Sequence, residues 1–209
     1  MNPFRQFLIK SCHFDAGHDL AHTERVVKNA ERLVKEEGPG ADSEIIKAAA
    51  WLHDCVTVPK DHSDRSKASM LAAEKAGKFL ESIQFPPKKI DDVKHAIEAH
   101  SFSAGIRPRT IEAKIVQDAD RLDALGAMGI ARCFAVGGQL NRPIYNPADP
   151  FCKTEPPNDQ KWTLDHFYVK LFELPGEMNT EAAKREAEKR VEYMKQFLQE
   201  LEAEITTGS

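Results

Sequence analysis

Histidine and aspartate residues in three separated stretches are the best candidates for chemistry in this chain. The central pair, His53–Asp54, lies in the stretch WLHDCV. A neutral imidazole beside a carboxylate suits a divalent cation such as Zn, Mn, Fe or Ni. Adjacent helical residues point about 100° apart, so both side chains reach one ion only where a helix ends or opens into a pocket. Pro59 disfavours a helical residue 58 and predicts such an end soon after the pair.

The stretch HDLAHTERV places His18 and His22 one helical turn apart, with Arg25 three residues further on. His22 and Arg25 then share one side of a helix. Such a face can bind a metal ion through the imidazole and a phosphate through the guanidinium fork. A surface helix with ordinary polar residues is the alternative.

The stretch KIVQDADRLDALG contains Asp118, Asp120 and Asp123 among apolar residues. Carboxylates beside core-facing residues are costly unless they are paired or bind a metal. Asp118 lies about 200° around the helix from Asp120, so at most two of the three carboxylates face one site. We expect Arg121 to form a salt bridge with a remaining carboxylate.

Taken together, these motifs resemble those of the HD superfamily of metal-dependent phosphohydrolases. The matching pieces are His22 in HTERV, His53–Asp54 in WLHDC and Asp120 in DADRLD, in that order. The resemblance spans residues 18–126. The tail from WTLDHFYVKLFELPGEMNT onward looks like one bacterial subgroup, some members of which are nucleoside or deoxynucleoside triphosphate pyrophosphatases.

The resemblance implies one divalent metal ion, either Mn, Ni, Fe, Co or Zn, and a phosphorylated small-molecule substrate, a nucleotide above all. An ion of this kind can activate water and polarise a phosphoryl group. Arg25 would neutralise charge on the phosphoryl oxygens. The implied metal ligands are His22, His53, Asp54 and Asp120, and the candidate substrate-binding residues are His18, Lys60 and Arg65, each of which also suits a solvated surface position.

His95 and His100 are further candidates for catalysis. They are five residues apart, about 140° around a helix, so they cannot share one ion unless the helix ends between them. A second metal, a phosphate contact and a general acid are the alternatives. We favour a substrate or phosphate role over a second metal.

The sequence therefore predicts a metal-dependent nucleotide phosphohydrolase, with a nucleoside triphosphate pyrophosphatase as the favoured activity. A nucleotide phosphomonoesterase or phosphodiesterase is the enzymatic alternative. A non-catalytic nucleotide-binding regulator is the alternative from another class.

The composition is that of an ordinary globular protein. The 209 residues are 41% hydrophobic and 30% charged, and the net charge of −4 favours neither nucleic acid nor a membrane surface as a partner. The four cysteines, at positions 12, 55, 133 and 152, show no disulfide or CxxC spacing, so we expect reduced thiols and a cytoplasmic protein.

Helical periodicity dominates, and no strand alternation is evident, so the predicted fold class is all-α. We expect a single HD-type helical domain over 1–209, with its metal-site core at about 18–126, including one long helix over 110–136. A proline-rich irregular loop at about 137–161 suits either a lid or a passive surface excursion. A helical extension at about 161–205 follows, and its apolar stripe indicates core packing or a homodimer contact.

Overall fold

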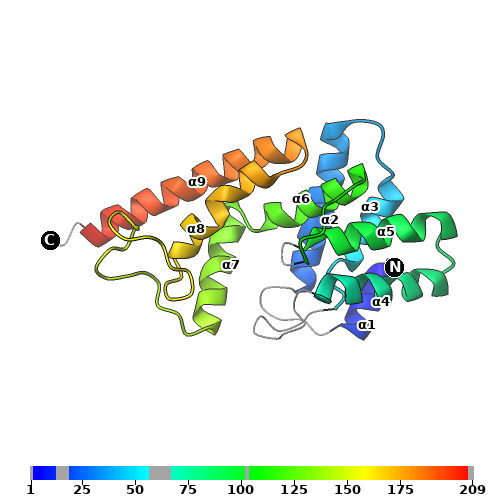
Figure 1. The fold of residues 1–209 in the computed structure, drawn as a ribbon, viewed down its shortest axis with the longest axis horizontal. Coiled ribbons are helices and arrows are strands. Elements are labelled where there is room, and N and C mark those ends of the chain that lie inside the picture. The colour runs from blue at the N-terminus through cyan, green and yellow to red at the C-terminus, as the bar shows by residue number, and fades with distance from the viewer. Residues whose placement is uncertain (1, 13–18, 57–66, 102–103, 207–209) are drawn as a thin grey trace. The chain divides into compact units, whose positions relative to one another are not determined.

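The computed structural model describes residues 2–12, 19–56, 67–101 and 104–206, and all regular structure within them is helical. The all-α prediction is confirmed. None of these described helices combines the length and the apolar character that a bilayer crossing requires. In chain order (Figure 1) the elements are α1 (Pro3–Ser11), α2 (Leu20–Glu37), α3 (Ser43–Leu52), α4 (Ala68–Ser82), α5 (Pro87–His100), α6 (Ile111–Asp123), α7 (Gly126–Gln139), α8 (Asp165–Val169), the 3-10 helix η3 (Leu171–Glu177) and α9 (Glu181–Thr206).

The chain divides into two compact units, residues 1–120 and 121–209. In the first unit α3 is the central helix, and it packs against α1, α2, α4 and α5. Seven of its ten residues are buried and all seven are apolar, whereas the exposed residues Ser43, Glu44 and Lys47 are polar. Helices α4 and α5 lie side by side (Figure 1). The stretch that leads into His53–Asp54 is thus fixed within the core of this unit.

The sequence predicts a helix that has Ser43 as its N-cap and runs through Asp54, and both ends of α3 differ from this prediction. The N-cap is Asp42 and not Ser43, because the Asp42 carboxylate accepts hydrogen bonds from the amides of Glu44 and Ile45. The helix ends at Leu52 and does not continue through Asp54. The His–Asp pair therefore occupies the turn that follows the helix, where adjacent side chains can reach one point.

The single long helix predicted for residues 110–136 is wrong, since α6 ends at Asp123 and α7 begins at Gly126. Gly126 has φ +72°, a left-handed conformation that glycine adopts without steric cost. A Cβ atom at Gly129 would lie 2.1 Å from the carbonyl oxygen of Ala124. These glycines allow the helix to break and the chain to pass close to Ala124. The helical spacing of apolar residues continues across the break and therefore does not predict it.

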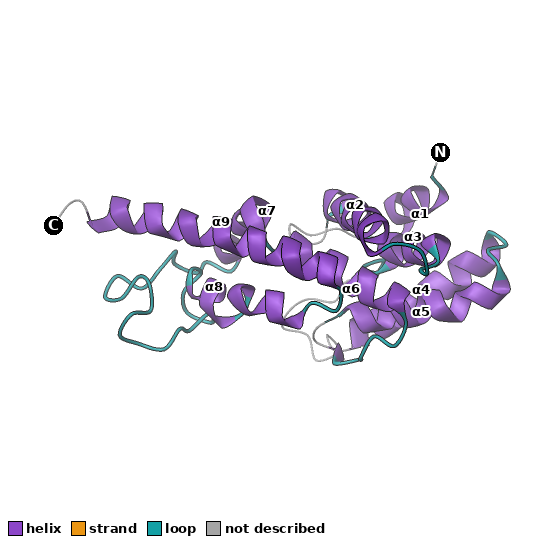
Figure 2. Ribbon diagram, turned by 90° about the horizontal axis from the view of Figure 1, so that it is seen from above, coloured by secondary structure: helices purple, strands orange, loops and turns teal. Residues whose placement is uncertain are grey.

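In the second unit, α7 and η3 pack against α9, and η3 also packs against α8. Figure 2 shows α9 as a long continuous helix. Its buried stripe follows the predicted helical spacing over Ala183, Ala187, Val191, Met194 and Leu198.

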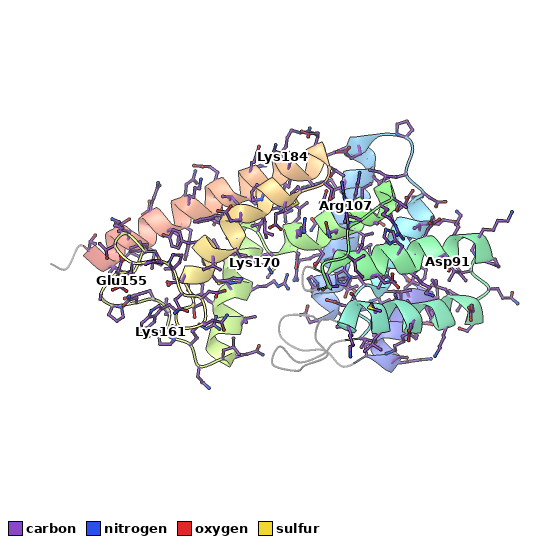
Figure 3. All side chains as sticks on the ribbon, in the orientation of Figure 1. Asp91, Arg107, Glu155, Lys161, Lys170 and Lys184 are labelled. Carbon is purple, nitrogen blue, oxygen red and sulfur yellow. The ribbon has the colours of Figure 1, made fainter. Side chains whose placement is uncertain are left out.

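The segment between α7 and α8 begins later than predicted, because Gly137 and Gly138 still belong to α7, and it ends later, where α8 begins at Asp165. The Asp149 carboxylate organises its turn by accepting hydrogen bonds from the amides of Lys153, Thr154 and Glu155. Figure 3 shows the side chains of Glu155 and Lys161, which both belong to this segment.

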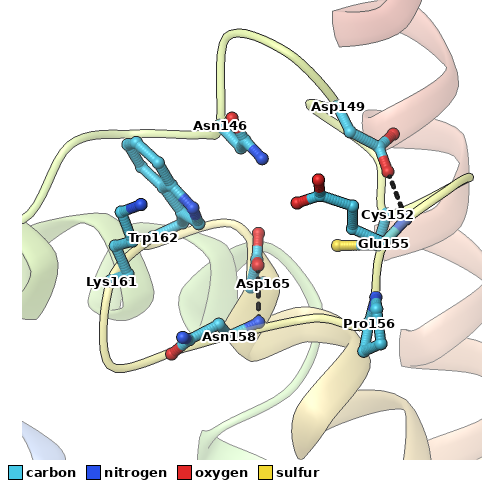
Figure 4. Close-up of a pocket in the computed structure, with 9 residues that line it drawn as sticks. All are labelled: Asn146, Asp149, Cys152, Glu155, Pro156, Asn158, Lys161, Trp162 and Asp165. Carbon is cyan, nitrogen blue, oxygen red and sulfur yellow. Dashed lines mark hydrogen bonds between the residues drawn. The ribbon is translucent and has the colours of Figure 1, made fainter.

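A cavity of about 210 Å³ lies within this segment of the second unit. Figure 4 shows Trp162 on one side of the cavity and Glu155 on the other. One oxygen of Asp165 accepts the Asn158 amide at 2.7 Å, which joins the loop to the start of α8.

Candidate metal site

The first unit brings together four side chains from three separate parts of the chain. His22 comes from the first turn of α2, His53 and Asp54 from the turn after α3, and Asp120 from α6. The Asp19 carboxylate caps α2 by accepting the His22 amide at 2.6 Å, and this fixes the turn that carries the imidazole. On α6, Asn29 of α2 donates to the Ala119 carbonyl at 3.1 Å, next to Asp120.

The distances between the facing nitrogen and oxygen atoms of this cluster are close to the distances between two ligand atoms of one metal ion. The Nε2 atoms of His22 and His53 are 3.3 Å apart. His22 Nε2 lies 3.4 Å from Asp120 Oδ1 and 3.7 Å from Asp54 Oδ2. Ligands about 2.1 Å from one ion are separated by roughly 3.0 Å in an octahedron and roughly 3.4 Å in a tetrahedron. The four side chains could therefore bind one ion after small adjustments.

Hydrogen bonds to main-chain carbonyls fix the orientation of two imidazoles. His53 Nδ1 lies 2.8 Å from the Ala50 carbonyl, and His100 Nδ1 lies 2.6 Å from the Ile97 carbonyl. A carbonyl only accepts, so each Nδ1 carries the proton, and the lone pair of neutral His53 is on Nε2, which faces the cluster. Such partners of the second nitrogen are typical of metal-binding histidines.

His100 lies beside the cluster on the Asp54 side. Its Nε2 is 3.4 Å from Asp54 Oδ1, and its ring centroid is 4.9 Å from that of His53. Ligand atoms of His53, Asp54 and His100 all lie within 4.8 Å of one another, as do those of His22, His53 and Asp120. The geometry thus offers overlapping sets of ligands that share His53.

Burial and charge set the protonation of the cluster. Burial lowers the pKa of His53 to about 4, although the Asp54 charge acts in the opposite direction. Burial alone would raise the pKa of Asp54, but the charge of His53 and hydrogen bonds from His100 and His22 hold it well below its ordinary value. Near neutral pH this part of the cluster therefore combines an uncharged imidazole with an ionised carboxylate.

The other carboxylate and His100 are shifted by the same contacts. The pKa of Asp120 is lowered, because the hydrogen bond from His22 and the nearby histidines outweigh the effect of burial. For His100, burial would lower the pKa, but the hydrogen bond to Asp54 and the carboxylate charges raise it above its ordinary value. The donor set, imidazole nitrogen with ionised carboxylate oxygen, fits a borderline divalent cation.

The cluster is open on its carboxylate side. The side chains of His22 and His53 are 1% and 0% exposed, whereas those of Asp54 and Asp120 are 20% and 28% exposed. A ligand approaching from solvent would meet the carboxylates first, while the imidazoles form the closed side.

The remaining candidates occupy different positions. Arg25 lies on α2 three residues beyond His22 and is partly exposed. His95 Nε2 accepts the backbone amide of Arg109 at 3.0 Å, so this ring nitrogen supports the segment before α6. His18, Lys60 and Arg65 lie outside the described residues.

The spare aspartate and the cysteine next to the pair have structural partners. Asp123 pairs with Arg132 at 2.9 Å, while the predicted donor Arg121 contacts Glu177 instead. Cys55 is buried, and its thiol donates to the Ala72 carbonyl at 3.3 Å. Burial and then the nearby Cys12 raise the pKa of Cys55 to about 12, which makes it a poor metal ligand or nucleophile.

Comparison with known proteins identifies the class to which this fold and cluster belong. The family model of the HD domain matches residues 19–125, a range that contains the four clustered side chains. The chain belongs to the HD superfamily of hydrolases.

Bacterial relatives cover nearly the whole chain. The uncharacterized protein YpgQ of Bacillus subtilis is 34% identical over 194 residues, which are 91% of this chain and 85% of YpgQ. The crystal structure of an HD-superfamily hydrolase from Bacillus thuringiensis is 40% identical, with a TM-score of 0.73 over 96% of this chain and 94% of that one. A crystal structure of B. subtilis YpgQ in complex with ADP is 32% identical, with a TM-score of 0.73 over 97% and 93% of the two chains.

Proposed function

We propose that this protein is a divalent-metal-dependent phosphohydrolase that acts on nucleotides, with a nucleoside or deoxynucleoside triphosphate pyrophosphatase as the preferred activity. The observation that carries the proposal is the convergence of two imidazole Nε2 atoms with two carboxylates within 3.3–3.9 Å. The complex of B. subtilis YpgQ with ADP supports a nucleotide as the ligand.

In this proposal His22, His53, Asp54 and Asp120 hold the ion. A bound divalent ion lowers the pKa of a water molecule and polarises the phosphoryl group. The protein directs this chemistry by keeping the His53 proton on Nδ1, against the Ala50 carbonyl, so that Nε2 remains available for binding. The partly exposed carboxylates form the side from which the phosphate enters.

His100 acts in this proposal as a catalytic residue that orients Asp54 and donates a proton. Its Nδ1 is bound to the Ile97 carbonyl, so Nε2 is the atom that faces Asp54 and the space beyond it. A histidine in this position can protonate the phosphate oxygen that leaves. Arg25, one turn beyond His22, would neutralise charge on the non-bridging oxygens. His18, Lys60 and Arg65 remain proposed substrate contacts.

His95 has a supporting role in the same proposal. Because one of its ring nitrogens accepts the Arg109 amide, His95 fixes the chain that leads into α6, the helix that carries Asp120. We assign the catalytic imidazole to His100 for this reason.

The experiment is incubation of the purified chain with Mn²⁺ and a panel of nucleoside triphosphates, diphosphates, monophosphates and cyclic nucleotides. Separate assays follow the release of orthophosphate and of pyrophosphate. His53→Ala is the test variant. His166→Gln is the matched control, because His166 pairs with Asp159 in the second unit.

The expected result is pyrophosphate and nucleoside monophosphate from triphosphates, with at least a 100-fold loss in His53→Ala and none in His166→Gln. Orthophosphate as the sole product would redirect the activity to a phosphomonoesterase. Turnover that survives His53→Ala would exclude the proposed metal mechanism. Tight nucleotide binding without any turnover would identify a regulator instead of an enzyme.

A further inference from the structure

Lys75 on α4 connects two distant segments of the first unit through its ammonium group. Its Nζ donates a hydrogen bond to the carbonyl of Ser11 at 2.7 Å and another to the carbonyl of Cys55 at 3.0 Å. Ser11 is the last residue of α1, and Cys55 directly follows the His53–Asp54 pair. One side chain therefore joins the end of α1 to the turn that carries two proposed metal ligands.

The Cys55 peptide is the point at which this turn is attached to its surroundings. Its amide donates to the Leu52 carbonyl at 3.1 Å, and its thiol donates to the Ala72 carbonyl on α4. Its carbonyl accepts the thiol of Cys12 at 3.1 Å in addition to Lys75. Of these partners only Lys75 brings a formal charge.

The chemistry of lysine suits this position. An ammonium group has three donors and can satisfy two carbonyls at once. A positive charge is favourable beside the carbonyls at a helix C-terminus, where the helix dipole is negative. Hydrogen bonds from charged donors are also stronger than neutral ones. Lys75 thus holds the end of α1 and the turn after α3 with one charge.

We propose that Lys75 is a positioning residue for the metal site. It fixes the backbone one residue beyond Asp54 and so keeps the Asp54 carboxylate 3.5 Å from His53 Nε2. This inference rests on the proposed function, because it takes Asp54 as a ligand. It concerns the affinity for the metal ion, not the identity of the substrate.

Loss of a group that orients a metal ligand typically weakens metal affinity about 10- to 100-fold. Lys75 acts through one peptide unit and Cys12 still contacts the same carbonyl, so we expect about a tenfold loss, at the lower end of this range. The loss appears in metal binding itself, without any nucleotide present.

The test uses the full chain and Mn²⁺ alone, with dissociation constants from isothermal titration calorimetry at 25 °C and melting temperatures from circular dichroism. Lys75→Met removes the ammonium and retains most of the apolar stem. Lys78→Met is the matched control, since Lys78 is an exposed lysine three residues further along the same helix. Lys75→Arg restores a cation at the position.

The inference predicts about tenfold weaker Mn²⁺ binding in Lys75→Met, wild-type binding in Lys78→Met and binding within about threefold of wild type in Lys75→Arg. A folded Lys75→Met protein with a lower melting temperature and unchanged Mn²⁺ affinity would show a merely structural role and overturn the proposal. If Lys75→Met does not fold, Lys75→Arg decides, and a tenfold loss in that variant contradicts the inference.

These results separate the inference from the proposed function. Wild-type protein that binds Mn²⁺ and turns over no nucleotide contradicts the proposed substrate, while the comparison of Lys75 variants still holds. Wild-type protein without affinity for Mn²⁺, Co²⁺ or Zn²⁺ overturns both.

Discussion

Replacing Gly129 by alanine should destabilise the second unit, although alanine is the better helix former. A Cβ atom at this position would lie 2.1 Å from the carbonyl oxygen of Ala124 and 2.5 Å from its carbonyl carbon. Both atoms are backbone, so no side chain can rotate to relieve the overlap, and the break between α6 and α7 must shift. Overpacking of this kind costs about 1–3 kcal/mol, occasionally more.

The helix propensity of alanine offsets up to about 1 kcal/mol of this cost. Because the contact involves backbone, we take the upper part of the range and expect a net loss of about 2 kcal/mol. For a chain of this size the melting temperature should fall by roughly 4–8 °C. Differential scanning calorimetry measures it, with any added metal held constant.

Gly138→Ala is the matched control, because Gly138 is in the same helix, is exposed and has no atom within 4 Å of the point that a Cβ atom would occupy. Here the propensity gain is unopposed, and stability should rise by up to about 1 kcal/mol. The two substitutions therefore have opposite signs. A rise in melting temperature for both, or an equal fall in both, would refute the steric reasoning.

Three further predictions concern single side chains. Arg190→Met removes the donor to the Leu122 carbonyl and should lower the free energy of unfolding in urea by about 1–2 kcal/mol. His95→Ala leaves the Arg109 amide without this acceptor and should cost about 1–3 kcal/mol in the same assay. Burial, and then the nearby Arg109, lowers the pKa of His95 in the folded protein. Below pH 6.5, His95 therefore binds fewer protons in the folded state than in the unfolded state. Wild type should lose stability as pH falls through this range, and His95→Ala should lose less. Hydrogen bonds from backbone amides lower the pKa of Asp149 in the folded protein. The contribution of Asp149 to stability should therefore be present above pH 3.8 and be lost as pH falls below it. In a pH series of thermal melts, the melting temperature of Asp149→Ala should fall less steeply at acid pH, the acid limb of the series, than that of wild type.

Each of these has a contradicting result. Unchanged urea stability in Arg190→Met would show that water replaces the guanidinium at no cost. A His95→Ala protein whose stability follows the wild-type pH profile would remove His95 as the titrating group. An acid limb as steep in Asp149→Ala as in wild type would place that titration elsewhere.

The sequence motifs were sufficient to identify side chains that lie close together in the structure. His22, His53, Asp54 and Asp120, the residues that the resemblance to HD phosphohydrolases implies as ligands, lie close together in the first unit. The helix end that the His53–Asp54 pair requires is present after Leu52. Residue type and order are informative here because a metal site restricts both.

Other features depend on contacts that no local pattern records. Lys75 reaches Ser11 and Cys55, which are 64 and 20 residues away, so its role cannot be inferred from periodicity. Asp123 pairs with Arg132 across the helix break, whereas the sequence suggested Arg121 as the partner of a spare carboxylate. The break itself depends on the backbone conformation of a glycine, and helical spacing of apolar residues does not reveal it.

The most direct test of the proposed metal site is the number of divalent ions bound per chain. Mn²⁺ titration by calorimetry, with metal analysis of the dialysed protein, should give one ion for wild type. Single alanine substitutions at His22, His53, Asp54 and Asp120 should each reduce the affinity at least 100-fold, while His166→Gln should retain it. Wild-type affinity in His53→Ala, or in both Asp54→Ala and Asp120→Ala, would contradict a metal site formed by these four residues.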